Sequence, residues 1–299
     1  MKSEGKIGLV GTGMLGNAVG LHLLESKFSL TVYNRTKEKT LELKKNGATI
    51  VDSPREVAQA SDLVITCVKD ANAVREVSFE KNGIVEGAQE KLVVADMSTI
   101  SPIESRKIAE EFKGSRITML DTPVMGGPNV AINGKLVVMI SGDENAFKKF
   151  KKVFETIGNQ VFFLGKNGVA HSVKLAMNIQ IAMLALALSE GITLARATSV
   201  EPEVFLKILN STYFKTGMSE NKAFKMIKDE FKPTFTLSNL KKDLNTINET
   251  ARSFGIELPM STKAEEIYKK AIENGFGDLD YTGVLAYLKL ATKAKNLQN

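Results

Sequence analysis

The chain has 299 residues, enough for two domains, and its 43% hydrophobic and 25% charged residues are ordinary for a globular protein. Its net charge is +6, but the lysines are scattered among acidic residues with no basic tail, so we expect no nucleic-acid partner. The only cysteine, Cys67, excludes an internal disulfide, and with just two histidines beside it we expect no structural metal site.

The first half of the chain alternates short apolar runs with helical patterns. The predicted strands are Lys6–Gly11, Ser29–Tyr33, Leu63–Val68, Lys91–Asp96, Thr118–Asp121, Leu136–Ser141 and Gln160–Leu164. Helical patterns lie between most of these strands, among them Thr36–Asn46, Ser53–Ala60 and Pro102–Phe112. Such alternation predicts a doubly wound α/β domain of the Rossmann type, with a mostly parallel sheet between two layers of helices.

The first predicted strand leads into a glycine-rich hexapeptide. Its residues are Gly11, Thr12, Gly13, Met14, Leu15 and Gly16, and a helical pattern follows. Strand, glycine turn and helix in this order are typical of dinucleotide binding. The first glycine permits the tight turn, the second lets a pyrophosphate approach the backbone, and the third lets the helix pack against the strand. Since a helix N-terminus offers free N–H groups to phosphates, we predict that these six residues bind a dinucleotide.

The end of the second predicted strand indicates which dinucleotide is bound. NAD sites usually carry a carboxylate there, which accepts a hydrogen bond from the ribose 2′-hydroxyl. Here the residues are Asn34, Arg35 and Thr36. An arginine pairs with a 2′-phosphate, and the other two side chains offer hydrogen bonds to it, so we predict NADP as the cofactor. The alternative is that Arg35 simply begins the next helix and points to solvent.

The second half of the chain has almost no strand pattern. Its predicted helices are Ala170–Ala197, Pro202–Asn210, Ser219–Lys228, Leu237–Phe254, Pro259–Asn274 and Tyr281–Leu290. Pro202 and Pro259 suit the first turn of a helix. We therefore predict an all-α C-terminal domain, with the boundary at Leu164/Gly165, so that residues 1–164 form the nucleotide-binding domain and 165–299 a helical domain for substrate binding and oligomerisation.

The most apolar segment of the chain is Leu175–Leu188. It is shorter than the roughly 20 residues that a helix needs to cross a bilayer, and it is bounded by Lys174 and Glu190. We expect a buried helix, no membrane partner and a cytoplasmic protein, because the N-terminal apolar run is also broken by glycines and indicates no signal peptide. Since this helix is apolar nearly all round, we expect part of it to pack against another subunit in a homodimer or homotetramer.

Three later motifs, together with the glycine turn, resemble the β-hydroxyacid dehydrogenase family, which includes 3-hydroxyisobutyrate dehydrogenases and tartronate semialdehyde reductases. They are Asp121–Gly127, Gly165–Lys174 followed by Asn178, and Lys242–Leu244. The motifs occur in the family's order and spacing over essentially the whole chain. The resemblance implies an NADP-dependent oxidoreductase that interconverts a small β-hydroxyacid and its semialdehyde or keto form.

The resemblance assigns the chemistry to Lys174 and Asn178. Residues four apart lie on one face of a helix, one turn from each other. Hydride transfer to a carbonyl leaves an alkoxide that needs a proton and a nearby positive charge, and a lysine ammonium supplies both. Asn178 is then expected to orient the lysine or the substrate. Taken alone, a lysine at the start of an apolar helix more often only extends its charge into solvent.

The resemblance places the substrate carboxylate at Met125, Gly126 and Gly127. The two glycines are expected to donate backbone N–H groups to a small-molecule carboxylate. The family usually has a serine where this chain has Met125, so a hydroxyl contact is replaced by a flexible apolar side chain. The substrate is then less polar at this point, or the change is neutral because the backbone contacts remain. A second departure, Ala170 in place of a common glycine, is expected to change only local backbone freedom.

The resemblance implies four further cofactor contacts, from Val68, Lys69, Thr99 and Lys242. The first three lie at or just after the ends of predicted strands, and open α/β sheets bind ligands at the carboxyl ends of their strands. Lys242 matches a lysine of the helical domain, although an ordinary exposed lysine is the alternative.

The alternatives to a hydroxyacid dehydrogenase are an imine reductase, a non-catalytic NADP-binding scaffold and a 6-phosphogluconate dehydrogenase. An imine reductase would resemble this chain, but those enzymes usually lack the lysine. A non-catalytic NADP-binding scaffold would not need Lys174. A 6-phosphogluconate dehydrogenase needs a much longer helical domain than this chain offers.

Overall fold

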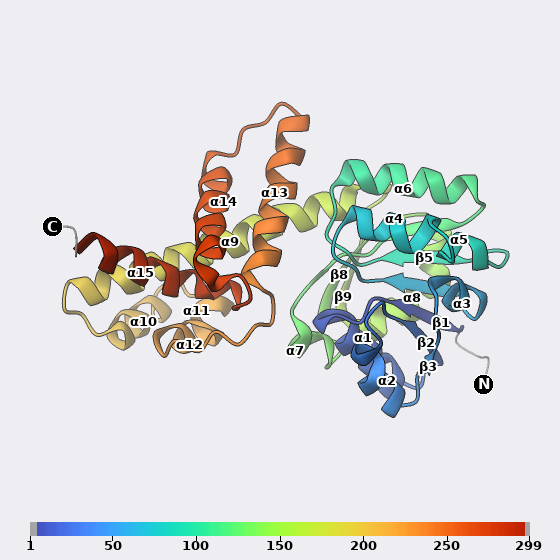
Figure 1. The fold of residues 1–299 in the computed structure, drawn as a ribbon, viewed down its shortest axis with the longest axis horizontal. Coiled ribbons are helices and arrows are strands. Elements are labelled where there is room, and N and C mark those ends of the chain that lie inside the picture. Colours follow the sequence, from blue (N-terminus) through green and yellow to red (C-terminus); the bar gives the residue numbers. More distant parts are fainter. Residues whose placement is uncertain (1–4, 297–299) are drawn as a thin grey trace. The chain divides into compact units, whose positions relative to one another are not determined.

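The computed structural model describes residues 5–296 (Figure 1). The chain divides into two compact units, one ending at Leu175 and the other beginning at Ala176. The N-terminal unit holds every β-strand of the described residues, and the C-terminal unit is helical. The α/β fold with a following all-α region is therefore confirmed.

One nine-stranded sheet organises the N-terminal unit. Its strands are β1 (Ile7–Val10), β2 (Leu30–Tyr33), β3 (Thr49–Ile50), β4 (Leu63–Thr66), β5 (Val93–Asp96), β6 (Thr118–Asp121), β7 (Val124–Met125), β8 (Leu136–Gly142) and β9 (Gly158–Phe163). They lie in the order β3-β2-β1-β4-β5-β6-β8-β7, and β9 pairs with β8. The strands from β3 to β6 are parallel, whereas β8 is antiparallel to β6 and β7. The seven predicted strands are confirmed; β3 and β7 have two residues each, too few to produce a periodic pattern.

Helices cover both faces of this sheet (Figure 1). They are α1 (Met14–Glu25), α2 (Leu41–Lys45), α3 (Pro54–Gln59), α4 (Ala71–Phe79), α5 (Ile84–Gly87), α6 (Pro102–Gly114), α7 (Pro128–Ala131) and α8 (Glu144–Ile157), with a 3₁₀ turn at Lys37–Thr40. Two separate buried clusters result. Val19 of α1 and Phe150 of α8 belong to one, and Val57 of α3 and Phe112 of α6 to the other. Because successive strand residues point to opposite faces, β1, β4, β5 and β6 each contribute to both clusters.

Local signals explain where the helices of this unit begin. Ser53, Asp70 and Ser101 each accept a hydrogen bond from a backbone N–H in the first turn of the helix that follows. Such caps satisfy N–H groups that have no partner within the helix. The predicted helix Thr36–Asn46 differs, because it divides into the 3₁₀ turn and the short α2.

The order of the strands reverses at β1. Its neighbours are β2 on one side and β4 on the other, so the connections leave β1 and β4 in opposite directions. In doubly wound sheets, ligands bind beside the carboxyl ends of the strands at such a switch point. The glycine turn directly follows β1 and is therefore at the expected place.

The C-terminal unit consists of helices joined by short loops. They are the second part of α9 (Val169–Ala197), α10 (Pro202–Asn210), α11 (Gly217–Asn221), α12 (Ala223–Ile227), α13 (Leu237–Ser253), α14 (Pro259–Ala271), a π-helical turn (Ile272–Phe276), a 3₁₀ turn (Tyr281–Gly283) and α15 (Val284–Asn296). Pro202 and Pro259 lie in the first turns of their helices, as predicted. The predicted helix Ser219–Lys228 is interrupted at Lys222, which separates α11 from α12.

Helix α9 is longer than Leu175–Leu188, the apolar segment from which a buried helix was predicted. It has 29 residues and is long and apolar enough to cross a membrane by length and composition. The sequence-based judgement that this segment is too short was therefore wrong, because the helix continues on both sides of it. The core helix of a soluble protein passes the same test, and 44% of the most apolar window is buried within the protein.

The two faces of the first turns of α9 have different surroundings. Ala170, His171 and Leu175 are buried in its first two turns, and the compact units divide after these turns. The boundary predicted at Leu164/Gly165 lies before α9 instead. On the opposite face of the helix, Val173 and Met177 are exposed. The expected second subunit on this helix stays a prediction.

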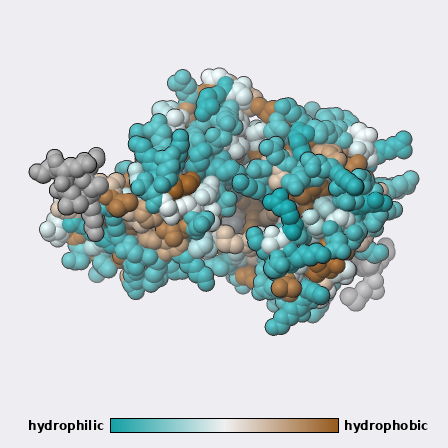
Figure 2. Space-filling model, viewed as in Figure 1, coloured by the Kyte–Doolittle hydropathy of each residue, from teal (hydrophilic) through white to brown (hydrophobic). Residues whose placement is uncertain are grey.

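Large apolar side chains are also exposed elsewhere, in both units. On the face drawn in Figure 2 they form separate brown patches within a mostly hydrophilic surface.

Candidate active site

The glycine turn has the shape that a dinucleotide requires. Gly11 has a φ of +99°, and a Cβ on it would lie 2.3 Å from the carbonyl oxygen of Cys67. A Cβ on Gly16 would lie 2.1 Å from the carbonyl oxygen of Gly11. Only glycine fits at these two positions. A Cβ on Gly13 would meet no atom within 4 Å, so this position opens onto free space through which a ligand can approach the backbone.

The start of α1 is open to an anion. Gly13 is its N-cap residue and has no side chain that could cap the N–H groups of its first turn. Met14, at the first helical position, is exposed, whereas Gly16 is buried. Free N–H groups at the positive end of a 12-residue helix are suited to bind the phosphates of a dinucleotide.

Asn34 connects the end of β2 to the glycine turn. Its Oδ1 accepts a hydrogen bond from the backbone N–H of Thr12 at 2.9 Å, and its Nδ2 donates to the carbonyl oxygen of Thr36 at 2.9 Å. The sequence suggested that Asn34 binds a 2′-phosphate. In this structure its amide holds the turn, so its first role is to position the backbone beside the cofactor.

Arg35 is exposed at the same strand end. Its side chain is 83% exposed, and its guanidinium lies 3.5 Å from the Glu76 carboxylate on α4. Exposed ion pairs of this kind contribute at most about 1 kcal/mol, so a phosphate can displace Glu76. No sequence pattern pointed to Glu76, because it lies 41 positions further along the chain than Arg35. The Thr36 side chain is also exposed and does not cap the 3₁₀ turn that follows it.

The loops after β4 and β5 lie next to each other. The backbone N–H of Val68 donates to the Ser98 hydroxyl at 3.0 Å, which joins the two loops. Lys69 is exposed and Thr99 is half-buried. Val68, Lys69 and Thr99, three of the predicted cofactor residues, are thus at the sheet edge that carries the glycine turn. Desolvation raises the pKa of the nearby Cys67 thiol to about 12, which makes it an unreactive neighbour.

Lys174 meets the loop that was predicted to hold the substrate. It projects from α9, half-buried, and its Nζ donates to the carbonyl oxygen of Val124 at 2.8 Å. The same Nζ lies 3.4 Å from the sulfur of Met125. Residues 49 and 50 positions apart are therefore adjacent within the N-terminal unit, as the resemblance implied. The methionine that replaces the family's serine contacts the lysine directly.

The two glycines after Met125 have different environments. Gly126 has a φ of +119°, and a Cβ on it would lie 2.8 Å from Leu136, so a side chain is excluded here. A Cβ on Gly127 would have no atom within 4 Å. As at Gly13, this open backbone position leaves room for a ligand.

Asn178 and Lys242 have a shared partner in the C-terminal unit. The fully buried Asn178 donates from Nδ2 to Asp243 Oδ2 at 2.7 Å. Lys242 forms an ion pair with Asp243 Oδ1, with the two atoms 2.6 Å apart. Asp243 was part of a sequence motif but was not selected as a site residue. The structure indicates that it fixes the orientation of the Asn178 amide.

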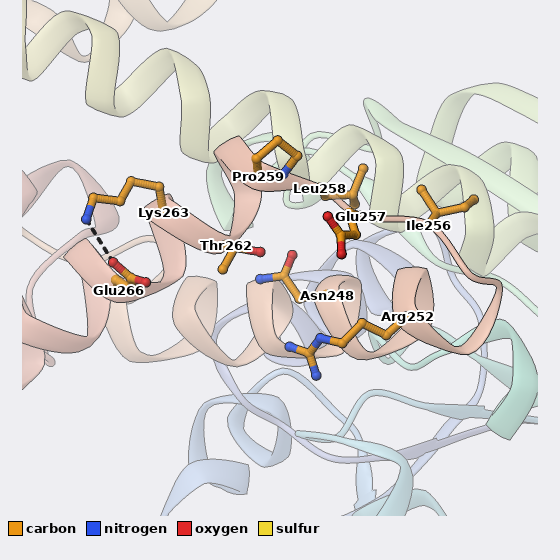
Figure 3. Close-up of a pocket in the computed structure, with 9 residues that line it drawn as sticks. All are labelled: Asn248, Arg252, Ile256, Glu257, Leu258, Pro259, Thr262, Lys263 and Glu266. Atoms are coloured by element: carbon orange, nitrogen blue, oxygen red, sulfur yellow. Dashed lines mark hydrogen bonds and ion pairs between the residues drawn. The ribbon is translucent and has the colours of Figure 1, made fainter.

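A cavity of about 440 Å³ lies elsewhere in the C-terminal unit, between the end of α13 and the start of α14 (Figure 3). It is lined by Asn248, Arg252, Ile256, Glu257, Leu258, Pro259, Thr262, Lys263 and Glu266. None of the predicted site residues lines it. The dashed contact in Figure 3 is the ion pair between Lys263 and Glu266, whose nitrogen and oxygen are 2.9 Å apart.

Family models match both units of the chain. Residues 6–165 match the NAD-binding domain of 6-phosphogluconate dehydrogenase, and residues 168–288 match the NAD-binding domain of NADP-dependent 3-hydroxyisobutyrate dehydrogenase. The chain belongs to the β-hydroxyacid dehydrogenase family. It is an oxidoreductase of this family, with a Rossmann domain that binds NAD(P).

Individual members of the β-hydroxyacid dehydrogenase family match nearly end to end. Glyoxylate/succinic semialdehyde reductase 1 of Arabidopsis thaliana is 31% identical over 96% of this chain and 99% of its own length. The 2-hydroxy-3-oxopropionate reductase of Escherichia coli (strain K12) is 30% identical over 97% and 99%. The crystal structure of 3-hydroxyisobutyrate dehydrogenase from Salmonella typhimurium is 26% identical, covers 94% of this chain and 99% of that one, and superposes with a TM-score of 0.87.

Proposed function

We propose that this protein interconverts a small β-hydroxyacid and its semialdehyde or keto form with NADP(H), and that Lys174 is the general acid and base. The observation that carries the proposal is the contact of the Lys174 ammonium with the Val124–Met125 segment. This contact supports the proposal because the ammonium lies next to the segment that leads directly into Gly126 and Gly127, the two glycines proposed to hold a carboxylate. An amine at this position can therefore act on a carbonyl a few atoms from that carboxylate.

The protein's own side chains are proposed to transfer one proton to or from the substrate oxygen. The cofactor, when bound, supplies or accepts the hydride. In reduction, the carbonyl oxygen gains negative charge, and the Lys174 ammonium stabilises this charge and donates a proton to the oxygen. In oxidation, the neutral amine accepts the proton from the hydroxyl. Asn178, held by Asp243, is the expected orienting residue, one helical turn after Lys174.

A substrate panel tests this function. Small semialdehydes and hydroxyacids would be assayed with NADPH and NADP⁺, with cyclic imines included for the alternative imine reductase. We expect turnover of at least one hydroxyacid–semialdehyde pair and none of the imines. Turnover of imines alone would favour the alternative, and tight NADPH binding with no turnover of any compound would favour a non-catalytic scaffold.

The preference for NADP rests on Arg35. Its guanidinium is exposed and pairs only weakly with Glu76, so it is free to meet a 2′-phosphate. We expect Arg35→Ala to raise the KM for NADPH about tenfold, since a charge-assisted hydrogen bond is worth about 1.5–3 kcal/mol. The KM for NADH should stay within about twofold, because NADH lacks the phosphate that Arg35 contacts. Steady-state kinetics with both cofactors measure the difference.

Glu76→Gln is the matched control for Arg35. It removes the competing carboxylate and keeps the side chain's shape, so the KM for NADPH should stay equal or fall. A native enzyme that prefers NADH, or an equal effect of Arg35→Ala on both cofactors, would contradict the assignment.

Met125 is proposed to limit the substrates that the site accepts. Met125→Ser restores a hydroxyl where the family usually has one and removes the sulfur contact with Lys174. We expect kcat/KM for small 3-hydroxyacids to rise about fivefold, which corresponds to the roughly 1 kcal/mol of one added hydrogen bond. Met125→Leu, which is also apolar, serves as the control. An unchanged kcat/KM in the serine variant would show that the methionine is neutral.

A further inference from the structure

The carboxylate of Asp121 is buried where the start of α9 meets the sheet. Asp121 ends β6 and is 0% exposed, and the proposed function gives it no role. Its Oδ1 accepts from the Ser105 hydroxyl at 2.6 Å and from the Asn167 amide at 3.0 Å. Its Oδ2 accepts from the Ser141 hydroxyl at 2.7 Å and from the backbone N–H of Gly168. A carboxylate has about four acceptor positions, so its capacity for hydrogen bonds is filled.

Two of these four donors belong to the loop that leads into α9. Asn167 and Gly168 directly precede the helix. The first N–H groups of a helix have no acceptor within the helix and need one from elsewhere. Asp121 supplies the acceptor for the N–H of Gly168, and the Ser141 hydroxyl accepts from the N–H of Ala170 at 3.1 Å. The start of α9 is therefore attached to side chains of two strands, β6 and β8.

The Ser141 hydroxyl joins the carboxylate to the helix, because one oxygen makes both contacts. It donates to Asp121 and accepts from Ala170, and Ser141 lies opposite Asp121 in the antiparallel pairing of β6 with β8. Ser105, on α6, also donates to Asp121, but its hydroxyl makes no hydrogen bond to α9 within the described residues. Both serines are 0% exposed. They differ in whether they reach the helix.

Strand β8 supports both partners of the Lys174 contact. The Val124–Met125 segment pairs with this strand at Val138 and Val137. Ser141 follows Val138 by three residues on the same strand, which is about 10 Å at about 3.3 Å per residue. One part of β8 therefore holds the segment that the ammonium contacts, and a second part holds the helix that carries the lysine.

We propose that Asp121 and Ser141 are positioning residues, which hold the first turn of α9 against the ends of β6 and β8 and so keep the Lys174 ammonium at the Val124–Met125 segment. The inference rests on the proposed function of Lys174, which follows Ala170 by four residues, about one helical turn. Without the Ser141 hydroxyl, the N–H of Ala170 loses its acceptor and the first turn can shift. A displacement of about 1 Å can cost an enzyme about 100-fold in rate.

The activity test compares Ser141→Ala with Ser105→Ala. Asp121 itself stays, because its loss would leave four donors without an acceptor. Each variant loses one buried hydroxyl and one hydrogen bond to the carboxylate, so Tm should fall by at least roughly 2–4 °C in both. Measured well below either Tm, kcat should fall about tenfold in Ser141→Ala and less than about twofold in Ser105→Ala.

Binding of the cofactor separates this effect from general damage to the fold. The Kd for NADPH should change less than about twofold in both variants, because neither touches the glycine turn. An equal loss of kcat in the two variants, or a native kcat in Ser141→Ala, would overturn the proposal.

A second measurement does not depend on turnover. Amide hydrogen exchange of the segment that holds Gly168, Ala170 and Lys174 reports local opening at the start of α9. We expect Ser141→Ala to speed this exchange about tenfold and Ser105→Ala to leave it near the native rate. Equal exchange in the two variants would overturn the proposal. If exchange differs as expected but Lys174→Ala keeps its activity, the proposed role of the lysine is wrong, whereas the attachment of α9 by Asp121 and Ser141 stands.

Discussion

Lys174→Ala is expected to lower kcat about 100- to 10,000-fold, the range that general acid–base catalysis contributes. The Nζ of Lys174 contacts Val124 and Met125, the two residues directly before the glycines. The Kd for NADPH should change less than about threefold, because the glycine turn and Arg35 are not altered. Single-turnover kinetics and cofactor titration measure the two quantities separately.

Lys166→Ala is the matched control for this variant. Lys166 is exposed and lies shortly before α9, so its loss removes the same charge without touching the Val124–Met125 segment. It should keep nearly all of the native kcat. If Lys174→Ala also retained its kcat, or if both variants lost it equally, the lysine would not be the proton donor.

Most of the fold follows from local patterns in the sequence. Continuous apolar runs such as Leu63–Val68 correspond to parallel strands buried on both faces, and Pro202 and Pro259 mark true helix starts. Errors occur where an element is too short for its period to be visible, as in β3 and β7. They also occur where tertiary contacts decide, as at Lys222, whose ammonium reaches the Asp280 carboxylate and which separates two short helices.

The site was less predictable than the fold. The motifs located Gly13 and Lys174, because each depends on residues close together in sequence. Glu76 and Asp243 act through partners 41 and 65 positions away, which no spacing rule reveals. The role of Asp121 was hidden for a different reason. An aspartate at the end of a strand indicates nothing by itself until the fold places the start of α9 against its carboxylate.

Gly13→Ala separates binding of the cofactor from stability of the fold. The added methyl group meets no protein atom within 4 Å, and the φ of −64° is allowed for alanine. We expect the free energy of unfolding to fall by only about 1 kcal/mol, the usual cost of alanine at an N-cap. The affinity for NADPH should fall at least about 100-fold, because the methyl group occupies the space through which the pyrophosphate approaches the backbone. Thermal unfolding and fluorescence titration with NADPH measure the two effects.

Alanine substitutions at two other glycines serve as controls for Gly13→Ala. Gly114→Ala, at the end of α6, also adds a methyl group to open space, and it should change neither stability nor affinity by much. Gly16→Ala would place its Cβ 2.1 Å from the Gly11 carbonyl oxygen, so the turn itself must shift and both quantities should fall. A Gly13→Ala protein that binds NADPH as the native one does would show that the cofactor lies away from this turn. If that variant instead unfolded like Gly16→Ala, the open space at Gly13 would not exist in solution. If Gly13→Ala loses affinity for NADPH but keeps its stability, the second glycine of the turn is required for ligand binding. Gly16, the third glycine, is then the one that the fold requires.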